Sequence, residues 1–191
     1  MNTLRFLISE DYKRLGRKGK IRFIIDVFVD PSFSICFWQR LCNWAKTCKH
    51  TFLIKIFKLI YFFISRSTGI QVPIGTSMGG GLRFFHYTGI VISSFAVIGK
   101  NCSIFNGVTI GQSHSRKNKG APTIEDGCVI FPGAKIIGKI KVGQKSIIGA
   151  NAVVTKDCPP FSIVVGVNKV LPYSSLTYFD TDEDKKLYGF N

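Results

Sequence analysis

The sequence predicts a mainly β chain, a parallel solenoid of six-residue repeats that follows an α-helical region. Two observations carry this prediction. Aliphatic residues recur six positions apart in the second part of the chain, and apolar residues at helical spacing dominate the first part. The pattern changes near residue 68. We therefore expect a helical region over residues 1–68, a solenoid over 69–171 and a C-terminal tail over 172–191.

The helical region is basic and aromatic. Residues 35–48 place apolar side chains at helical spacing, and residues 51–65 form the most apolar run of the chain. That run contains Lys55 and Lys58 and is shorter than the about 20 apolar residues that a membrane-spanning helix needs. We therefore expect either a helix buried against protein or one that rests on an anionic membrane surface.

The solenoid region repeats every six residues. Its aliphatic anchors fall at Ile92, Ile98, Ile104, Ile110, Ile124, Ile130, Ile136, Val142, Ile148 and Val154. A period of six fits neither an α-helix nor the alternation of a hairpin strand. It is typical of a hexapeptide solenoid, in which turns stacked about 4.8 Å apart bury the inward positions of each repeat.

One insertion interrupts the repeat between Ile110 and Ile124, which lie 14 positions apart and so out of step with a period of six. The intervening stretch is polar and basic. We expect residues 112–122 to leave the solenoid as a protruding loop, and such insertions often carry function because the scaffold fixes where they emerge.

Charge and residue types limit the function classes. The net charge of +15 indicates an anionic partner, such as nucleic acid, a membrane surface or a phosphorylated small molecule. The charge keeps a basic nucleic-acid-binding or scaffolding solenoid as the non-enzyme alternative, although no nucleic-acid motif supports it. The histidines, His50, His86 and His114, lack metal-ligand spacing, and we expect no metal site. Cysteines without a CxxC pair and a charged N-terminus predict free thiols and a cytoplasmic protein.

Several motifs of the solenoid region resemble a known enzyme family. They are HYTGIVI from residue 86, NGVTIG from residue 106, GAKIIG from residue 133 and IGANAVV from residue 148. Over residues 69–170 the chain resembles the serine acetyltransferase-like branch of the hexapeptide acyltransferases. Its basic N-terminus is similar to that of bacterial polysaccharide O-acetyltransferases. The resemblance implies a left-handed parallel β-helix, a homotrimer, and acetyl-CoA as co-substrate between subunits, with no permanently bound cofactor.

The resemblance also implies a catalytic base. The family histidine falls on His86, which lies six residues before Ile92, so we expect it in phase with the anchors. It would take a proton from the acceptor hydroxyl, which attacks the thioester directly. An imidazole pKa of about 6.5 suits that task. A backbone N–H at Gly111 or Gln112 would stabilise the developing oxyanion.

Further site positions follow from the same resemblance. CoA phosphates would meet backbone amides and lysines. The expected CoA-binding residues are Pro132, Gly133, Lys135, Gly138, Gly149, Ala150, Lys156 and Lys169. The expected acceptor-binding residues are Gln71, Phe85, Asn106 and His114. His114 is alternatively a solvated loop residue.

The acceptor prediction rests on departures from the family pattern. Serine acetyltransferases carry aspartate just before the histidine and again upstream, where this chain has Phe85 and Gln71, and an Arg-His pair where it has Gly120-Ala121. An amino-acid acceptor would lose these charge partners. We therefore expect O-acetylation of a sugar hydroxyl of a bacterial surface polysaccharide or its precursor, with peripheral contact at the inner membrane face. Sugar-nucleotide N-acetylation and serine O-acetylation are the alternatives.

Overall fold

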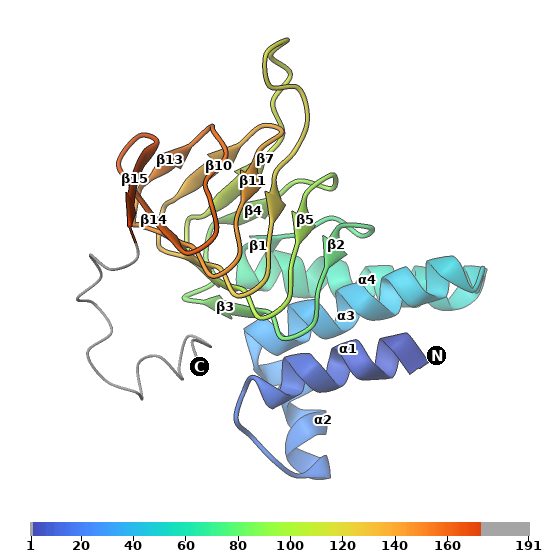
Figure 1. The fold of residues 1–191 in the computed structure, drawn as a ribbon. Coiled ribbons are helices and arrows are strands. Elements are labelled where there is room, and N and C mark those ends of the chain that lie inside the picture. Colours follow the sequence, from blue (N-terminus) through green and yellow to red (C-terminus); the bar gives the residue numbers. More distant parts are fainter. Residues whose placement is uncertain (1, 173–191) are drawn as a thin grey trace.

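The protein is a prism of stacked coils that rests on a group of helices (Figure 1). The computed structural model describes residues 2–172. Over these residues no helix has the length and apolar character needed to cross a membrane. The expected tail, 172–191, lies outside the described residues except for its first position.

Helices fill residues 2–68, as the apolar spacing predicts. They are α1 (Asn2–Lys13), α2 (Lys20–Val29), α3 (Pro31–Thr47) and α4 (Thr51–Thr68). Asp30 caps α3, because its carboxylate accepts a 3.0 Å hydrogen bond from the Phe33 N–H. α4 ends at Gly69, whose φ of 70° is in the left-handed region that favours glycine.

The remaining described chain winds into a left-handed parallel β-helix of three sheets, which confirms the expected fold class. Sheet A holds β1 (Ile70–Gln71), β4 (Ile90–Ile92), β7 (Thr109–Gly111), β10 (Lys135–Ile137) and β13 (Val153–Val154). Sheet B holds β2 (Ser77–Met78), β5 (Val97–Ile98), β8 (Thr123–Ile124) and β11 (Lys141–Val142). Sheet C holds β3 (Arg83–Phe85), β6 (Ser103–Phe105), β9 (Val129–Ile130), β12 (Ile147–Ile148), β14 (Ser162–Val165) and β15 (Lys169–Pro172). Only β14 and β15 pair antiparallel among these strands.

The predicted anchors form the core of the prism. All of them are at most 2% exposed, from Ile92 through Val154. In sheet A, Ile92 pairs in register with Ile110, and Ile110 with Ile136, so equivalent side chains stack in columns. Burying each such side chain contributes about 1.5–3 kcal/mol, which explains why a short strand of two or three residues suffices in every coil.

A buried ion pair joins the helices to the first coil. Arg40 on α3 donates to Asp11 on α1 over 2.6 and 3.0 Å, and both side chains are almost wholly buried. Asp11 also accepts hydrogen bonds from the N–H groups of Gly81 and Leu82, at 2.8 and 3.2 Å. Arg40 donates in turn to the carbonyl of Met78 over 3.1 Å. The helices are thus fixed to the start of the prism.

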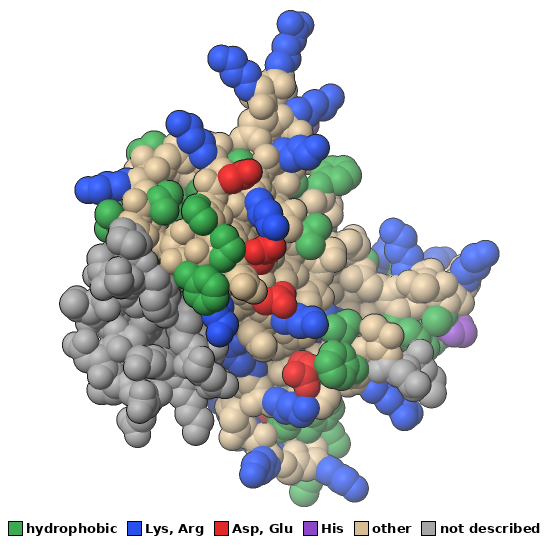
Figure 2. All heavy atoms as spheres, in the orientation of Figure 1, with side chains coloured by type: hydrophobic (Ala, Val, Ile, Leu, Met, Phe, Trp, Pro, Cys, Tyr) green, Lys and Arg blue, Asp and Glu red, His purple; other side chains and the backbone are tan. Residues whose placement is uncertain are grey.

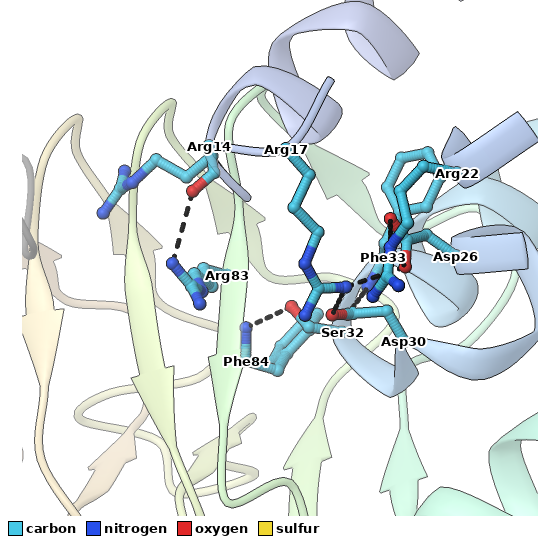
Figure 3. Close-up of polar contacts among 9 residues, drawn as sticks. All are labelled: Arg14, Arg17, Arg22, Asp26, Asp30, Ser32, Phe33, Arg83 and Phe84. Carbon is cyan, nitrogen blue, oxygen red and sulfur yellow. Dashed lines mark hydrogen bonds and ion pairs between the residues drawn. The ribbon is translucent and has the colours of Figure 1, made fainter. Parts of the chain in front are cut away.

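A second set of contacts ties β3 to the helices (Figure 3). The Phe84 N–H donates to Ser32 Oγ over 2.8 Å, and Arg83 donates to the Arg14 carbonyl over 3.3 Å. β3 leads directly into the turn that carries His86. The position of that turn is therefore fixed from both the prism and the helical side.

Candidate active site

His86 lies on a two-residue bulge at the corner between β3 and β4. Phe85 pairs with Phe105 and Val91 with Thr109, so five residues connect the strands of this coil where three connect those of the next. The expectation that His86 is in phase with the anchors is therefore wrong. The inward position of this coil belongs to Phe84, which is 3% exposed, and the bulge carries His86 outward.

The imidazole of His86 is exposed. Its backbone is in the left-handed region, with φ of 51°, and its carbonyl accepts hydrogen bonds from the Thr88 N–H at 2.6 Å and the Thr88 hydroxyl at 3.3 Å. A non-glycine residue held in this conformation is uncommon and marks a position that the surrounding structure imposes. Within residues 2–172 the ring makes no hydrogen bond or ion pair, so it is open to an acceptor.

The neighbours of His86 on sheet C form an aromatic row. The rings of Phe85 and Phe105 stack with centroids 4.7 Å apart, and those of Phe105 and Phe131 with centroids 5.2 Å apart. The Arg83 guanidinium lies over the Phe85 ring, 4.8 Å from its centroid. Phe85 therefore packs on the outer face of sheet C, and its ring extends the row of the next two coils.

Most of the expected CoA-binding residues line the corner between sheets C and A. We call this corner the His86 edge (residues 85–89, 106–107, 131–135 and 149–151). Its coils are held in register by hydrogen bonds of 2.9 Å from the Gly107 N–H to the Thr88 carbonyl and from the Gly133 N–H to the Asn106 carbonyl. The expected residues on it are Phe85, His86, Asn106, Pro132, Gly133, Lys135, Gly149 and Ala150.

Lys135, an expected CoA-binding residue, contacts its own scaffold. Its ammonium donates to the Gly107 carbonyl over 2.6 Å and to the Thr109 hydroxyl over 3.1 Å. The side chain thus contacts the preceding coil of its own scaffold. A phosphate partner would have to compete with these two hydrogen bonds.

Five of the other expected residues line the opposite side of sheet A. We call it the loop edge (residues 111–122, 138–139 and 155–156), and Figure 1 shows the loop protruding from it. Ser113 and Gly120 close the loop with hydrogen bonds of 2.8 and 3.0 Å. Gln112 and His114 lie side by side, with 2.9 Å between the Gln112 amide nitrogen and His114 Nε2. The expected residues here are Gly111, Gln112, His114, Gly138 and Lys156.

A single chain therefore separates the expected base from the expected oxyanion donors. His86 precedes β4, the sheet A strand of its coil, whereas Gly111 ends β7, the sheet A strand of the next coil, and Gln112 follows it. Lys169 lies on neither edge, because it begins β15 opposite Val165 on sheet C.

A cavity of about 840 Å³ lies between α4 and β1, and it contains residues that sequence reasoning missed. Its lining comprises Lys58, Tyr61, Phe62, Ser65, Arg66, Gly69, Gln71 and Ile74. Gln71 was the only one of these expected in a site. Five of the others recur along α4 at helical spacing, from Lys58 to Arg66, which is a signal for a shared face, but the sequence does not show that this face meets the first strand. Burial raises the pKa of the Tyr61 hydroxyl, which donates to the Val72 carbonyl and stays neutral.

Comparison with known proteins gives consistent matches. Residues 121–156 match the bacterial transferase hexapeptide (six repeats) family. Serine acetyltransferase of Bacillus subtilis is 38% identical over 132 residues, which cover 65% of this chain and 59% of that protein. The Mycobacterium tuberculosis enzyme of the same name is 44% identical over 100 residues, covering 52% and 44%. The chain spans less than two thirds of the length of these curated relatives.

Solved structures agree with the sequence matches. Soybean serine acetyltransferase superposes with a TM-score of 0.74 at 26% identity, covering 90% of this chain and 70% of that one. The Neisseria gonorrhoeae serine acetyltransferase in complex with serine gives a TM-score of 0.72 at 28% identity, covering 89% and 69%.

These matches correct the acceptor prediction. A surface polysaccharide as acceptor is contradicted, since the relatives and structural neighbours are named serine acetyltransferases. The prediction treated Phe85 as a lost charge partner of the acceptor. In the structure the Phe85 ring packs in the aromatic row on sheet C. That packing explains a phenylalanine at this position, so the residue is no evidence for a sugar acceptor. By its repeats, its coils and its relatives, the chain is similar to the hexapeptide-repeat acetyltransferases.

Proposed function

We propose that the chain transfers the acetyl group of acetyl-CoA to the hydroxyl of L-serine, with no resident cofactor. The observation that carries this proposal is the exposed imidazole of His86, presented on a bulge of a β-helix that is similar to serine acetyltransferases. Serine O-acetylation was an alternative in the sequence analysis. The names of the relatives now favour it over transfer to a sugar.

The reaction needs one base and one oxyanion site. His86 takes the proton as the acceptor oxygen attacks the thioester carbonyl, forming the new C–O bond. The carbonyl oxygen becomes negative and is stabilised by a backbone N–H at Gly111 or Gln112. Collapse of the intermediate breaks the C–S bond, and the imidazolium returns its proton to the leaving CoA sulfur. No acyl-enzyme forms, and acetyl ester and free CoA are the products.

A homotrimer would complete this site. The His86 edge of one copy and the loop edge of its neighbour supply the base and the oxyanion donor from the two sides of a groove. The N–H groups of Gly107, Gly133 and Gly149 already donate to neighbouring coils, so Lys156 and Lys169 are the candidates for the CoA phosphates. The basic loop tip, with Arg116, Lys117 and Lys119, adds positive charge at the mouth of this groove.

The test is a CoA-release assay with a panel of acceptors. L-serine, an amino sugar, a free sugar and a surface polysaccharide are each offered with acetyl-CoA, and the His86→Ala variant is the control. We expect turnover with serine that the variant loses. Turnover with the amino sugar alone would instead support N-acetylation. No acetylation of serine at millimolar concentration would refute the proposal.

We also propose that the helices contact an anionic membrane. α2 exposes Ile21, Ile24 and Phe28 at helical spacing, and Phe52 and Phe63 on α4 are 73% and 62% exposed. α4 carries basic residues among these and no carboxylate, which is the pattern of a helix lying in a lipid interface. Figure 2 shows hydrophobic and basic side chains interleaved over the helices.

Vesicle sedimentation tests this contact. The protein should pellet with phosphatidylglycerol-containing vesicles and much less with phosphatidylcholine alone, and high salt should weaken the binding. A Phe52→Ser/Phe63→Ser variant should lose it, while Lys100→Gln/Lys139→Gln, on the β-helix, should keep most of it. Equal loss in both variants would show that binding does not depend on this face, and no binding at low salt would refute the contact.

A further inference from the structure

The cavity between α4 and β1 is positively charged. Lys58 and Arg66 from α4 and Gln71 from β1 line it, and none of its lining residues is acidic. Within residues 2–172 these three side chains make no ion pair and no hydrogen bond. The hydroxyls of Tyr61 and Ser65, by contrast, already donate to the carbonyls of the first strand and the residue that follows it. The groups left to a ligand are therefore two cations and one neutral amide.

Arg66 is held in place at the cavity. Its guanidinium lies over the Phe62 ring, 4.9 Å from the centroid, and both residues are lining residues. Arg66 is an exposed residue, so this cation–π contact favours one orientation of the guanidinium and leaves its N–H groups free to donate. The planar N–H donors of a guanidinium can bind a carboxylate or a phosphate through two parallel hydrogen bonds.

The cavity adjoins the turn of the candidate base. Gly69, at its rim, packs beneath that turn so closely that a Cβ at this position would lie 3.5 Å from Thr88 Cα and 3.4 Å from the Gly89 nitrogen. Thr88 in turn donates to the carbonyl of His86. The cavity therefore borders the turn that carries His86.

We infer that this cavity binds the acceptor through its carboxylate, with Arg66 as the principal partner. Gln71 offers only a neutral oxygen to an ammonium group, so the amino group of the acceptor adds little. The substrate class is then small hydroxy acids, with or without an α-amino group. This inference rests on the proposed function and explains how an acceptor such as serine is held without the aspartates of the family pattern.

Two acceptors that each lack one charged group of serine test the carboxylate and the ammonium separately. 3-Hydroxypropanoate keeps the carboxylate and the hydroxyl, whereas ethanolamine keeps the ammonium and the hydroxyl. With the full chain and saturating acetyl-CoA, we expect serine and 3-hydroxypropanoate to be acetylated with KM values within about ten-fold, and ethanolamine not to be acetylated. Arg66→Gln should raise KM for both acids by about 10- to 100-fold with little change in kcat, as loss of a hydrogen bond to a charged group predicts. Arg66→Lys should recover part of that loss, and Lys100→Gln should change nothing.

Two kinds of failure are distinguishable. Acetylation of serine and ethanolamine but not of 3-hydroxypropanoate would overturn the inference while the proposed function stands. So would an unchanged KM in Arg66→Gln. If no hydroxyl acceptor is acetylated, the proposed function fails, and calorimetric titration with 3-hydroxypropanoate then decides the inference. Binding that Arg66→Gln abolishes would support the carboxylate site, and no binding to the wild type would refute it.

Discussion

Replacing Asp11 by alanine should loosen the joint between the helices and the first coil. The substitution leaves the Arg40 guanidinium, whose side chain is 4% exposed, without its carboxylate. It also leaves the N–H groups of Gly81 and Leu82 without their acceptor. Burial raises the pKa of Asp11, and the Arg40 guanidinium and these backbone donors oppose that rise, so the pair is held together by several mutual contacts.

The magnitude follows from that geometry. Removing one partner of a buried ion pair costs about 3–5 kcal/mol, because the other charge stays buried. For a chain of this size about 1 kcal/mol lowers Tm by roughly 2–4 °C, so Asp11→Ala should lower Tm by roughly 6–20 °C. Urea unfolding followed by circular dichroism measures the loss at fixed protein concentration.

A neighbouring ion pair supplies the control. Glu10 pairs with Lys13 at the surface over 2.7 Å, and Glu10→Ala should cost less than about 1 kcal/mol. Asp11→Ala/Arg40→Met should recover part of the loss, because it removes the stranded charge. If Asp11→Ala were within about 1 kcal/mol of the wild type, the buried pair would not hold the joint.

Three other substitutions and measurements test the structure. His86→Ala should lower kcat by about 100- to 10,000-fold in the CoA-release assay. Its unfolding midpoint should stay close to that of the wild type, because the side chain is exposed on a bulge. A variant with wild-type kcat would exclude His86 as the base. Gly99→Ala should destabilise the chain by about 1–3 kcal/mol in urea unfolding, because its Cβ would lie 2.6 Å from the Glu125 carbonyl carbon; an unchanged midpoint would mean that the coils can separate freely. Burial raises the pKa of the Cys42 thiol to about 11, so between pH 9 and 11 the unfolded chain loses this proton while the native chain keeps it. Stability should therefore fall as pH rises through that window and fall less in Cys42→Ala, whereas an equal fall in both would assign the effect to other groups.

The sequence predicts the prism well because its signal is strictly local. Each anchor from Ile92 to Val154 is buried by the same position in the neighbouring coil, so a period read along the chain determines the contacts across it. The helices and the protruding loop follow from similar local signals. The hand and the stacking of three sheets came from the family resemblance, because no period distinguishes a left-handed from a right-handed coil.

The site was harder to predict for two physical reasons. The family resemblance assigns the base to His86, but its distance of six residues from Ile92 does not make it an inward position, because two inserted residues shift the phase; the inward residue is Phe84. The cavity beside Gln71 is formed where α4 meets β1, and no pattern within either element reveals that contact. Residues such as Phe85 and Lys135 have chemistry that suits a site, yet they pack against their own scaffold.

The bulge that carries His86 also shows how such a chain tolerates change. Because each coil contacts only its neighbours, two extra residues at one corner leave the hydrogen bonds above and below intact, as the Gly107 N–H still meets the Thr88 carbonyl. Residues at a corner can thus be inserted, deleted or substituted without repacking the columns of buried side chains inside the prism. The prism separates the residues that maintain the fold from those that face a substrate, so selection can act on the second set alone.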